Sequence, residues 1–284
     1  MTTKLFGCNT YSYMRAERAA DCVARLAGHG FREFELMVHP GHLWADMPKP
    51  ELARLRALFA GGVRLTTLNM PNIDINVAAA AAEMRRYSLV MLRDVVRLAG
   101  ELGAPGVVIG PGKANPLFPA TAEELMPNFF AALDVLCPVA DAAGTALWLE
   151  NMPFAFMPGI DELVAALDRY GNDHIGIVYD AANAHFIDED IHAGLKRCGS
   201  RLRLVHLSDT GRRHYRHDPV GQGDVPFATI PAMLADVGYT RRPMLEIISP
   251  KGDADILDSA ARLASLGFGA PAEVSTCAHS MSSS

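Results

Sequence analysis

Four apolar segments of this sequence each end at a residue that can bind a metal ion. Carboxylate oxygens and imidazole nitrogens are common ligands of divalent cations. A single acidic residue at a strand end is more often a helix cap or an ion-pair partner, so the interpretation depends on the four occurring together. If four strand ends meet, the sequence predicts one cation held by three carboxylates and one imidazole. The segments are 145–149, 175–179, 202–205 and 244–245, and the residues that follow them are Glu150, Asp180, His206 and Glu246.

The whole chain alternates short apolar segments with longer amphipathic ones, which predicts eight strand–helix units. A glycine-rich phosphate turn does not follow the first segment, so a single (β/α)8 TIM barrel over residues 1–268 is favoured over a doubly wound sheet. In such a barrel the C-terminal strand ends form the active face. Residues 269–284 lack periodicity and are expected to be a flexible tail. We expect strands at 5–8, 31–37, 63–68, 106–109, 145–149, 175–179, 202–207 and 244–248, and helices at 16–28, 50–59, 78–102, 122–143, 160–170, 187–198, 227–237 and 254–266.

Composition narrows the class of protein. The chain has 284 residues, of which 50% are hydrophobic, and a net charge of −6, which argues against nucleic acid as a partner. Its five cysteines include no close pair, so we expect a reducing, cytoplasmic location and no thiolate zinc site. The N-terminus does not read as a signal peptide, and no membrane partner is expected. A homo-oligomer is left open.

Six short motifs occur in order along the chain. They are Asn-Ile-Asp-Ile-Asn at 72–76, Leu-Glu-Asn-Met-Pro at 149–153, Tyr-Asp-Ala-Ala-Asn-Ala-His at 179–185, Val-His-Leu-Ser-Asp at 205–209, Gly-Gln-Gly-Asp-Val at 221–225 and Leu-Glu-Ile at 245–247. In this order they resemble the xylose isomerase-like TIM barrel superfamily, and its sugar isomerase and epimerase branch in particular. The resemblance implies that Glu150, Asp180, His206 and Glu246 bind one divalent cation. The donor set suits Mn²⁺, Mg²⁺ or Co²⁺, with Zn²⁺ as an alternative.

Departures from the family pattern carry information about substrate. The endonuclease branch has additional histidine ligands where this chain has Gly-Pro-Gly at 110–112 and Asn183, so a nuclease is not expected. Many isomerases also have a substrate-binding histidine at the position of Asn183. His185 is a candidate to replace it, although it could equally cap or pack against the next helix. Arg216 and His217 are expected to contact substrate oxygens, the alternative being a solvated basic segment.

These residues together predict a metal-dependent isomerase or epimerase of a small keto or aldo sugar, or of a related polyhydroxy ketone. Glu150 and Glu246 would transfer a proton through an enediolate. Two alternatives stay open: a dehydratase of a keto-polyol or cyclic keto acid, and a sugar-binding barrel without catalytic activity. The sequence does not decide whether the substrate is phosphorylated.

Overall fold

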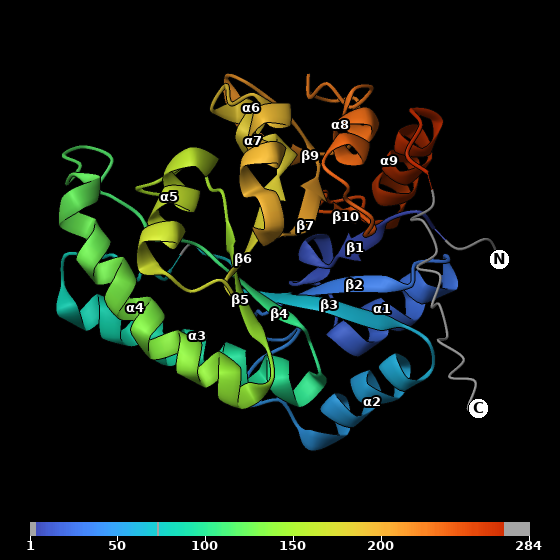
Figure 1. Ribbon diagram of the computed structural model, residues 1–284. Coiled ribbons are helices and arrows are strands. Elements are labelled where there is room, and N and C mark those ends of the chain that lie inside the picture. Colours follow the sequence, from blue (N-terminus) through green and yellow to red (C-terminus); the bar gives the residue numbers. More distant parts are fainter. Residues whose placement is uncertain (1–3, 73, 270–284) are drawn as a thin grey trace, which may run out of the picture.

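Eight parallel strands close into a barrel in the computed structural model, which describes residues 4–72 and 74–269 (Figure 1). Neighbouring strands follow the order β1-β10-β7-β6-β5-β4-β3-β2 around the barrel, so consecutive barrel strands in the chain lie side by side. This arrangement confirms the predicted α/β fold class, a single (β/α)8 barrel. Nearly all of the predicted tail, residues 270–284, lies outside the described residues.

Each predicted strand and helix has a counterpart whose ends coincide with the predicted ones or differ from them by up to four residues. The barrel strands are β1 (Gly7–Asn9), β2 (Glu33–Met37), β3 (Arg64–Asn69), β4 (Gly106–Ile109), β5 (Ala146–Glu150), β6 (Gly176–Asp180), β7 (Leu202–Leu207) and β10 (Met244–Leu245). The counterparts of the predicted helices are α1 (Ala19–Gly28), α2 (Lys49–Ala60), α3 (Ala82–Leu102), α4 (Ala122–Ala143), α5 (Ile160–Tyr170), α7 (Ile191–Cys198), α8 (Ile230–Asp236) and α9 (Asp253–Ser265). Two 3-10 turns are η1 (Tyr11–Tyr13) and η2 (Gly199–Arg201).

The sequence did not predict α6 (Ala181–Phe186) or the hairpin of β8 (Asp209–Gly211) and β9 (His214–Asp218). Helix α6 begins directly after β6 because the side chain of Asp180 caps it. The backbone N–H of Asn183 donates to Asp180 Oδ1 at 2.6 Å. Both additional elements follow strands that carry a predicted metal ligand at or next to their C-terminal end, Asp180 in β6 and His206 in β7.

An apolar layer inside the barrel fixes the level at which the predicted metal ligands lie. It is a cluster of buried side chains separate from the main core between strands and helices. Each of its last four members lies two residues before a predicted ligand. Since alternate residues of a strand face the same side, the ligands form the next interior layer toward the C-terminal strand ends. The cluster comprises Val108, Trp148, Val178, Leu204 and Met244.

Trp148 fills the barrel interior between two glycines of neighbouring strands. A Cβ atom added at Gly106 on β4, or at Gly176 on β6, would lie within 3.0 Å of atoms of the Trp148 ring system. Trp148 is 3% exposed and packs within the barrel core. The position of Trp148 therefore directs Glu150, two residues later, into the mouth of the barrel.

Helix α4 belongs to the outer layer of helices. It begins with a capping box, in which Thr121 and Glu124 bond each other's backbone N–H groups, and ends at Gly144 with a φ of +69°. By length and composition alone it could cross a membrane, but 39% of its apolar window is buried within this fold. One buried face packed on α3 and β5 is the pattern of a barrel helix.

Candidate metal centre and active site

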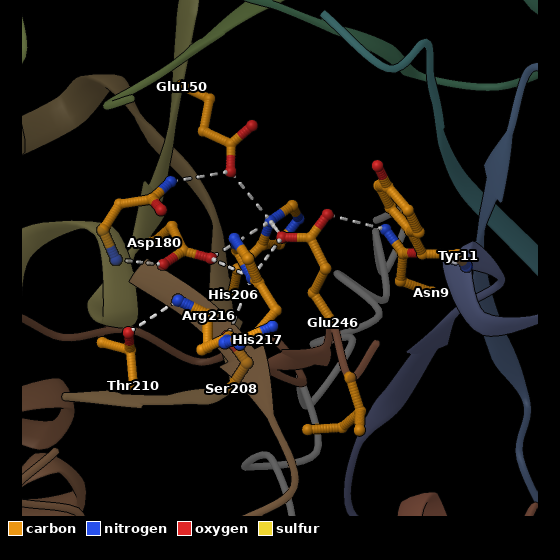
Figure 2. Close-up of polar contacts among 12 residues, drawn as sticks. Asn9, Tyr11, Glu150, Asp180, His206, Ser208, Thr210, Arg216, His217 and Glu246 are labelled. Atoms are coloured by element: carbon orange, nitrogen blue, oxygen red, sulfur yellow. Dashed lines mark hydrogen bonds and ion pairs between the residues drawn. The ribbon is translucent and has the colours of Figure 1, made fainter. Parts of the chain in front are cut away.

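The four predicted metal ligands converge at the C-terminal mouth of the barrel (Figure 2). One donor atom from each of Glu150, Asp180, His206 and Glu246 lies within 4.8 Å of each of the others, and all four residues are buried. Nδ1 of His206 lies 3.2 Å from Glu150 Oε1, 3.2 Å from Glu246 Oε2 and 3.8 Å from Asp180 Oδ2. The three carboxylates thus surround one imidazole nitrogen.

Glu35, on β2, holds the opposite nitrogen of the same imidazole. Its Oε2 lies 3.3 Å from His206 Nε2, and the carboxylate is completely buried. Asn9, Thr67 and Asn69 donate hydrogen bonds to Glu35. Burial alone would raise the pKa of Glu35, but the charge of His206 and the hydrogen bonds from His206, Thr67 and Asn69 lower it. In the neutral ring, with Nε2–H donated to an ionised Glu35, the lone pair of His206 Nδ1 faces the carboxylate cluster, and a metal ion would take the place of a proton on that nitrogen.

The electrostatics of the cluster fit a cation. Burial raises the pKa of Glu150, and raises that of Asp180 to about 6, because three carboxylates share a site out of water. Burial would lower the pKa of His206, but Glu35, Glu246 and Glu150 raise it well above its ordinary value. A positive charge among the carboxylates is therefore favoured.

An unsatisfied oxygen gives an independent test of the same fit. Oδ2 of Asp180 is buried and has no hydrogen-bond partner, although Oδ1 accepts from Asn183 N. A buried carboxylate oxygen without a partner is costly. A divalent cation coordinated by Asp180 Oδ2 and the three neighbouring ligands would satisfy it. Within residues 4–72 and 74–269, this is the one cluster of His, Cys, Asp and Glu with metal-binding geometry.

Asn183 and His217 approach the cluster through a chain of hydrogen bonds. Tyr215 Oη donates to Asn183 Oδ1 at 2.7 Å, so His217 Nε2 donates to the same tyrosine oxygen, also at 2.7 Å. In the neutral ring, His217 Nδ1 then accepts from Ser208 Oγ at 2.9 Å and lies 3.4 Å from Glu246 Oε2. Asn183 Nδ2 donates to the backbone oxygen of Asn151 and lies 3.5 Å from Glu150 Oε1. Both residues are thus held rigidly beside the carboxylates.

A cavity of about 380 Å³ opens above the cluster. Glu150 and Glu246 contribute to its polar floor, whereas Asp180 and His206 lie deeper. One wall is apolar and is formed mostly by the segment after β5. The described residues that line it are Tyr11, Met37, Asn69, Pro71, Asn72, Lys113, Glu150, Met152, Pro153, Phe154, Ala155, Asn183, Tyr215, His217, Glu246 and Ile248.

Two predicted substrate contacts, His185 and Arg216, are not among the residues that line this cavity. His185 is buried, and its Nε2 lies 2.6 Å from Asp224 Oδ1, which fits the packing alternative. The side chain of Arg216 is exposed because β9 alternates, sending Tyr215 and His217 to the cavity and Arg216 away from it. Arg216 contacts Thr210 only through its backbone N–H (Figure 2). His185 and Arg216 therefore do not line this cavity, and their contact with substrate stays a prediction.

Comparison with known proteins identifies the family of this barrel. The model of the family described as "Xylose isomerase-like TIM barrel" matches residues 23–266. An uncharacterized protein of Methanocaldococcus jannaschii is 24% identical over 239 residues, with 82% of this chain and 80% of that protein covered. Fructoselysine 3-epimerase of Shigella flexneri is 23% identical, with 78% and 85% covered. A probable endonuclease 4 of Oleidesulfovibrio alaskensis is 29% identical, with 63% and 66% covered.

Solved structures share the fold. A D-tagatose 3-epimerase-like protein superimposes with a TM-score of 0.79 at 21% identity, covering 93% of this chain and 97% of that one. The IOLI protein with a bound zinc atom has a TM-score of 0.74 at 18% identity, covering 92% and 96%. At these identities the structural likeness establishes the architecture alone.

Proposed function

The chain belongs to the xylose isomerase-like TIM barrel family, and on that premise we propose that it is a divalent-metal-dependent isomerase or epimerase. Its substrate would be a small keto or aldo sugar or a related polyhydroxy ketone. The observation that carries the proposal is the buried cluster of three carboxylates and one imidazole below a cavity of sugar-binding size. Epimerase relatives at 20–23% identity support the class of reaction.

Glu150, Asp180, His206 and Glu246 would hold one Mn²⁺, Mg²⁺ or Co²⁺ ion, with Zn²⁺ as an alternative. Such a cation polarises a carbonyl and lowers the pKa of the adjacent C–H group. Glu150 and Glu246 both reach the cavity, from β5 and from the end of β10. One of the two, as the ionised carboxylate, would remove the proton from carbon to give an enediolate, and the other, as the carboxylic acid, would return a proton to the opposite face of that carbon. In an isomerisation the proton would return to the neighbouring carbon while the hydroxyl proton moves to the former carbonyl oxygen.

His217 and Asn183 would orient the substrate oxygens. Both line the cavity beside the carboxylates, and the hydrogen bonds from Ser208 and Tyr215 hold them in place. Preorganised polar groups of this kind position a substrate without reorganising during the reaction. Tyr215 also packs edge-on against the His217 ring at a centroid distance of 5.2 Å, which restricts that ring further.

The proposal is tested by incubating metal-stripped protein, with and without each of the four cations, with a panel of ketoses, aldoses and their phosphates. We expect cation-dependent formation of an isomer or epimer, detected by chromatography without change of mass. A product lighter by one water would identify a dehydratase instead. Binding of intact sugar without any product, across the panel and with every cation, would contradict an enzymatic function.

A further inference from the structure

Resting on the proposed function, we infer that the substrate carries an anionic group, a phosphate or a carboxylate, at the end remote from the reacting carbonyl, and that Lys113 binds it. Lys113 follows β4 and lines the same cavity as Glu150 and Glu246. Among the described residues that line this cavity, it is the one lysine or arginine. The cavity therefore has carboxylates at one side and an ammonium group at another.

The position of Lys113 in the barrel explains this charge separation. The predicted metal ligands come from β5, β6, β7 and the end of β10, which are neighbours in the closed sheet. Strands β3 and β4 lie in the other half of the barrel, and the segments that follow them carry Asn72 and Lys113. A substrate whose carbonyl is held at the ligand half extends naturally toward Lys113.

The backbone around Lys113 is fixed by Asn76. Asn76 Oδ1 accepts from Lys113 N at 2.9 Å, and Asn76 Nδ2 donates to Lys113 O at 2.9 Å. The preceding Gly112 has a φ of +106°, and a Cβ atom there would lie 2.6 Å from Ala78 Cβ, so close packing also holds this turn. The Asn-Ile-Asp-Ile-Asn motif at 72–76 thus supplies the support for this lysine.

The ammonium group is directed rather than freely solvated. Lys113 Nζ donates to the backbone oxygen of Asn72 at 2.5 Å, and Asn72 itself lines the cavity. Burial lowers the pKa of Lys113, and the exposed Asp74 opposes that shift. A partly buried ammonium at the wall of a cavity is a strong site for an anion, because charge-assisted hydrogen bonds are about twice as strong as neutral ones.

The test compares selectivity in wild-type protein, Lys113→Met and Lys113→Arg. Met keeps the length of the apolar stem and removes the charge, whereas Arg keeps the charge. Lys49→Met is the matched control, because Lys49 is exposed at the start of α2 and does not line the cavity. The probes are ribulose, ribulose 5-phosphate and a 2-ketohexuronate, so that phosphate and carboxylate are distinguished. Both kcat/KM and Kd by calorimetry are measured on metal-loaded protein.

We expect wild type and Lys49→Met to favour at least one anionic probe over the uncharged ketose by about 10- to 100-fold, the range of a hydrogen bond to a charged group. The preference for the anionic probe over the uncharged ketose, as a ratio of their kcat/KM values or of their affinities, should fall at least tenfold in Lys113→Met. Lys113→Arg should largely retain it. Turnover without preference for either anion would overturn the inference while leaving the proposed function intact. Selective binding of an anion without turnover would support the inference and contradict the proposed function. Neither preference nor turnover would reject both.

Discussion

Replacing Glu35 by Gln tests how this barrel prepares His206 for a cation. Glu35 is completely buried, lies 3.3 Å from His206 Nε2 and receives hydrogen bonds from Asn9, Thr67 and Asn69. Gln would lose the charge that keeps the proton on His206 Nε2. Its amide N–H groups would also face the donors of Asn9, Thr67 and Asn69 that now bond to the carboxylate. Loss of such an outer partner typically lowers metal affinity about 10- to 100-fold, which corresponds to roughly 1.4–2.7 kcal/mol.

The assay is competition of Mn²⁺ and Zn²⁺ between the protein and a chelating dye at pH 7.5, with thermal unfolding of the metal-free protein to verify folding. Glu33→Gln is the matched control on the same strand, because Glu33 is buried but pairs with Arg64 and Arg242 instead of His206. We expect Glu35→Gln to bind metal more weakly than wild type, and Glu33→Gln to bind it as wild type does. A folded Glu35→Gln variant with a metal Kd within twofold of wild type would refute the argument.

Three further predictions follow from the cluster. Glu246→Gln should abolish turnover and weaken metal binding while the protein stays folded; substantial turnover with normal metal content would contradict this. Removing the metal with a chelator should lower the melting temperature by on the order of 5 °C, because the cation binds only the folded arrangement. An unchanged melting temperature in thermal unfolding would contradict this. Neighbouring carboxylates raise the pKa of His206 well above its ordinary value and burial raises that of Asp180 to about 6, so protons should compete with the cation at both groups, first at His206 and, below about pH 6, at Asp180 as well. The metal Kd, measured by dye competition, should rise by at least about tenfold per pH unit below pH 6, and a flat profile would contradict the competition.

The sequence predicted the fold and the four converging ligands because both depend on simple periodicity. Glu150 and Asp180 each follow an apolar strand directly, and this position places them at the C-terminal end of the barrel. The barrel topology then brings these strand ends together. Glu35 escaped prediction because both faces of its strand mix charged and apolar residues. In the structure β2 is buried on both sides, and Glu33 is neutralised by arginines, so alternation could not identify the inward face.

The substrate contacts depended on local geometry that sequence patterns do not encode. Arg216 and His217 are adjacent in a basic segment, and only the β8–β9 hairpin directs one outward and the other into the cavity. The capping of α6 by Asp180 turns Asn183 toward Glu150 and leaves His185 with Asp224. Lys113 carried no motif of its own, and its position results from contacts with Asn72 and Asn76, about 40 residues earlier in the chain.

The most direct test of proton transfer at carbon is whether deuterium from the solvent becomes bound to a carbon atom of the sugar. Metal-loaded protein is incubated in D₂O with the ketose that it converts most rapidly, and substrate and product are analysed by NMR and mass spectrometry. Proton transfer through Glu150 and Glu246 predicts deuterium at the epimerised or isomerised carbon of the product, dependent on the added cation. If product forms in D₂O but neither substrate nor product contains carbon-bound deuterium, early or late in the reaction, proton exchange through these carboxylates is contradicted.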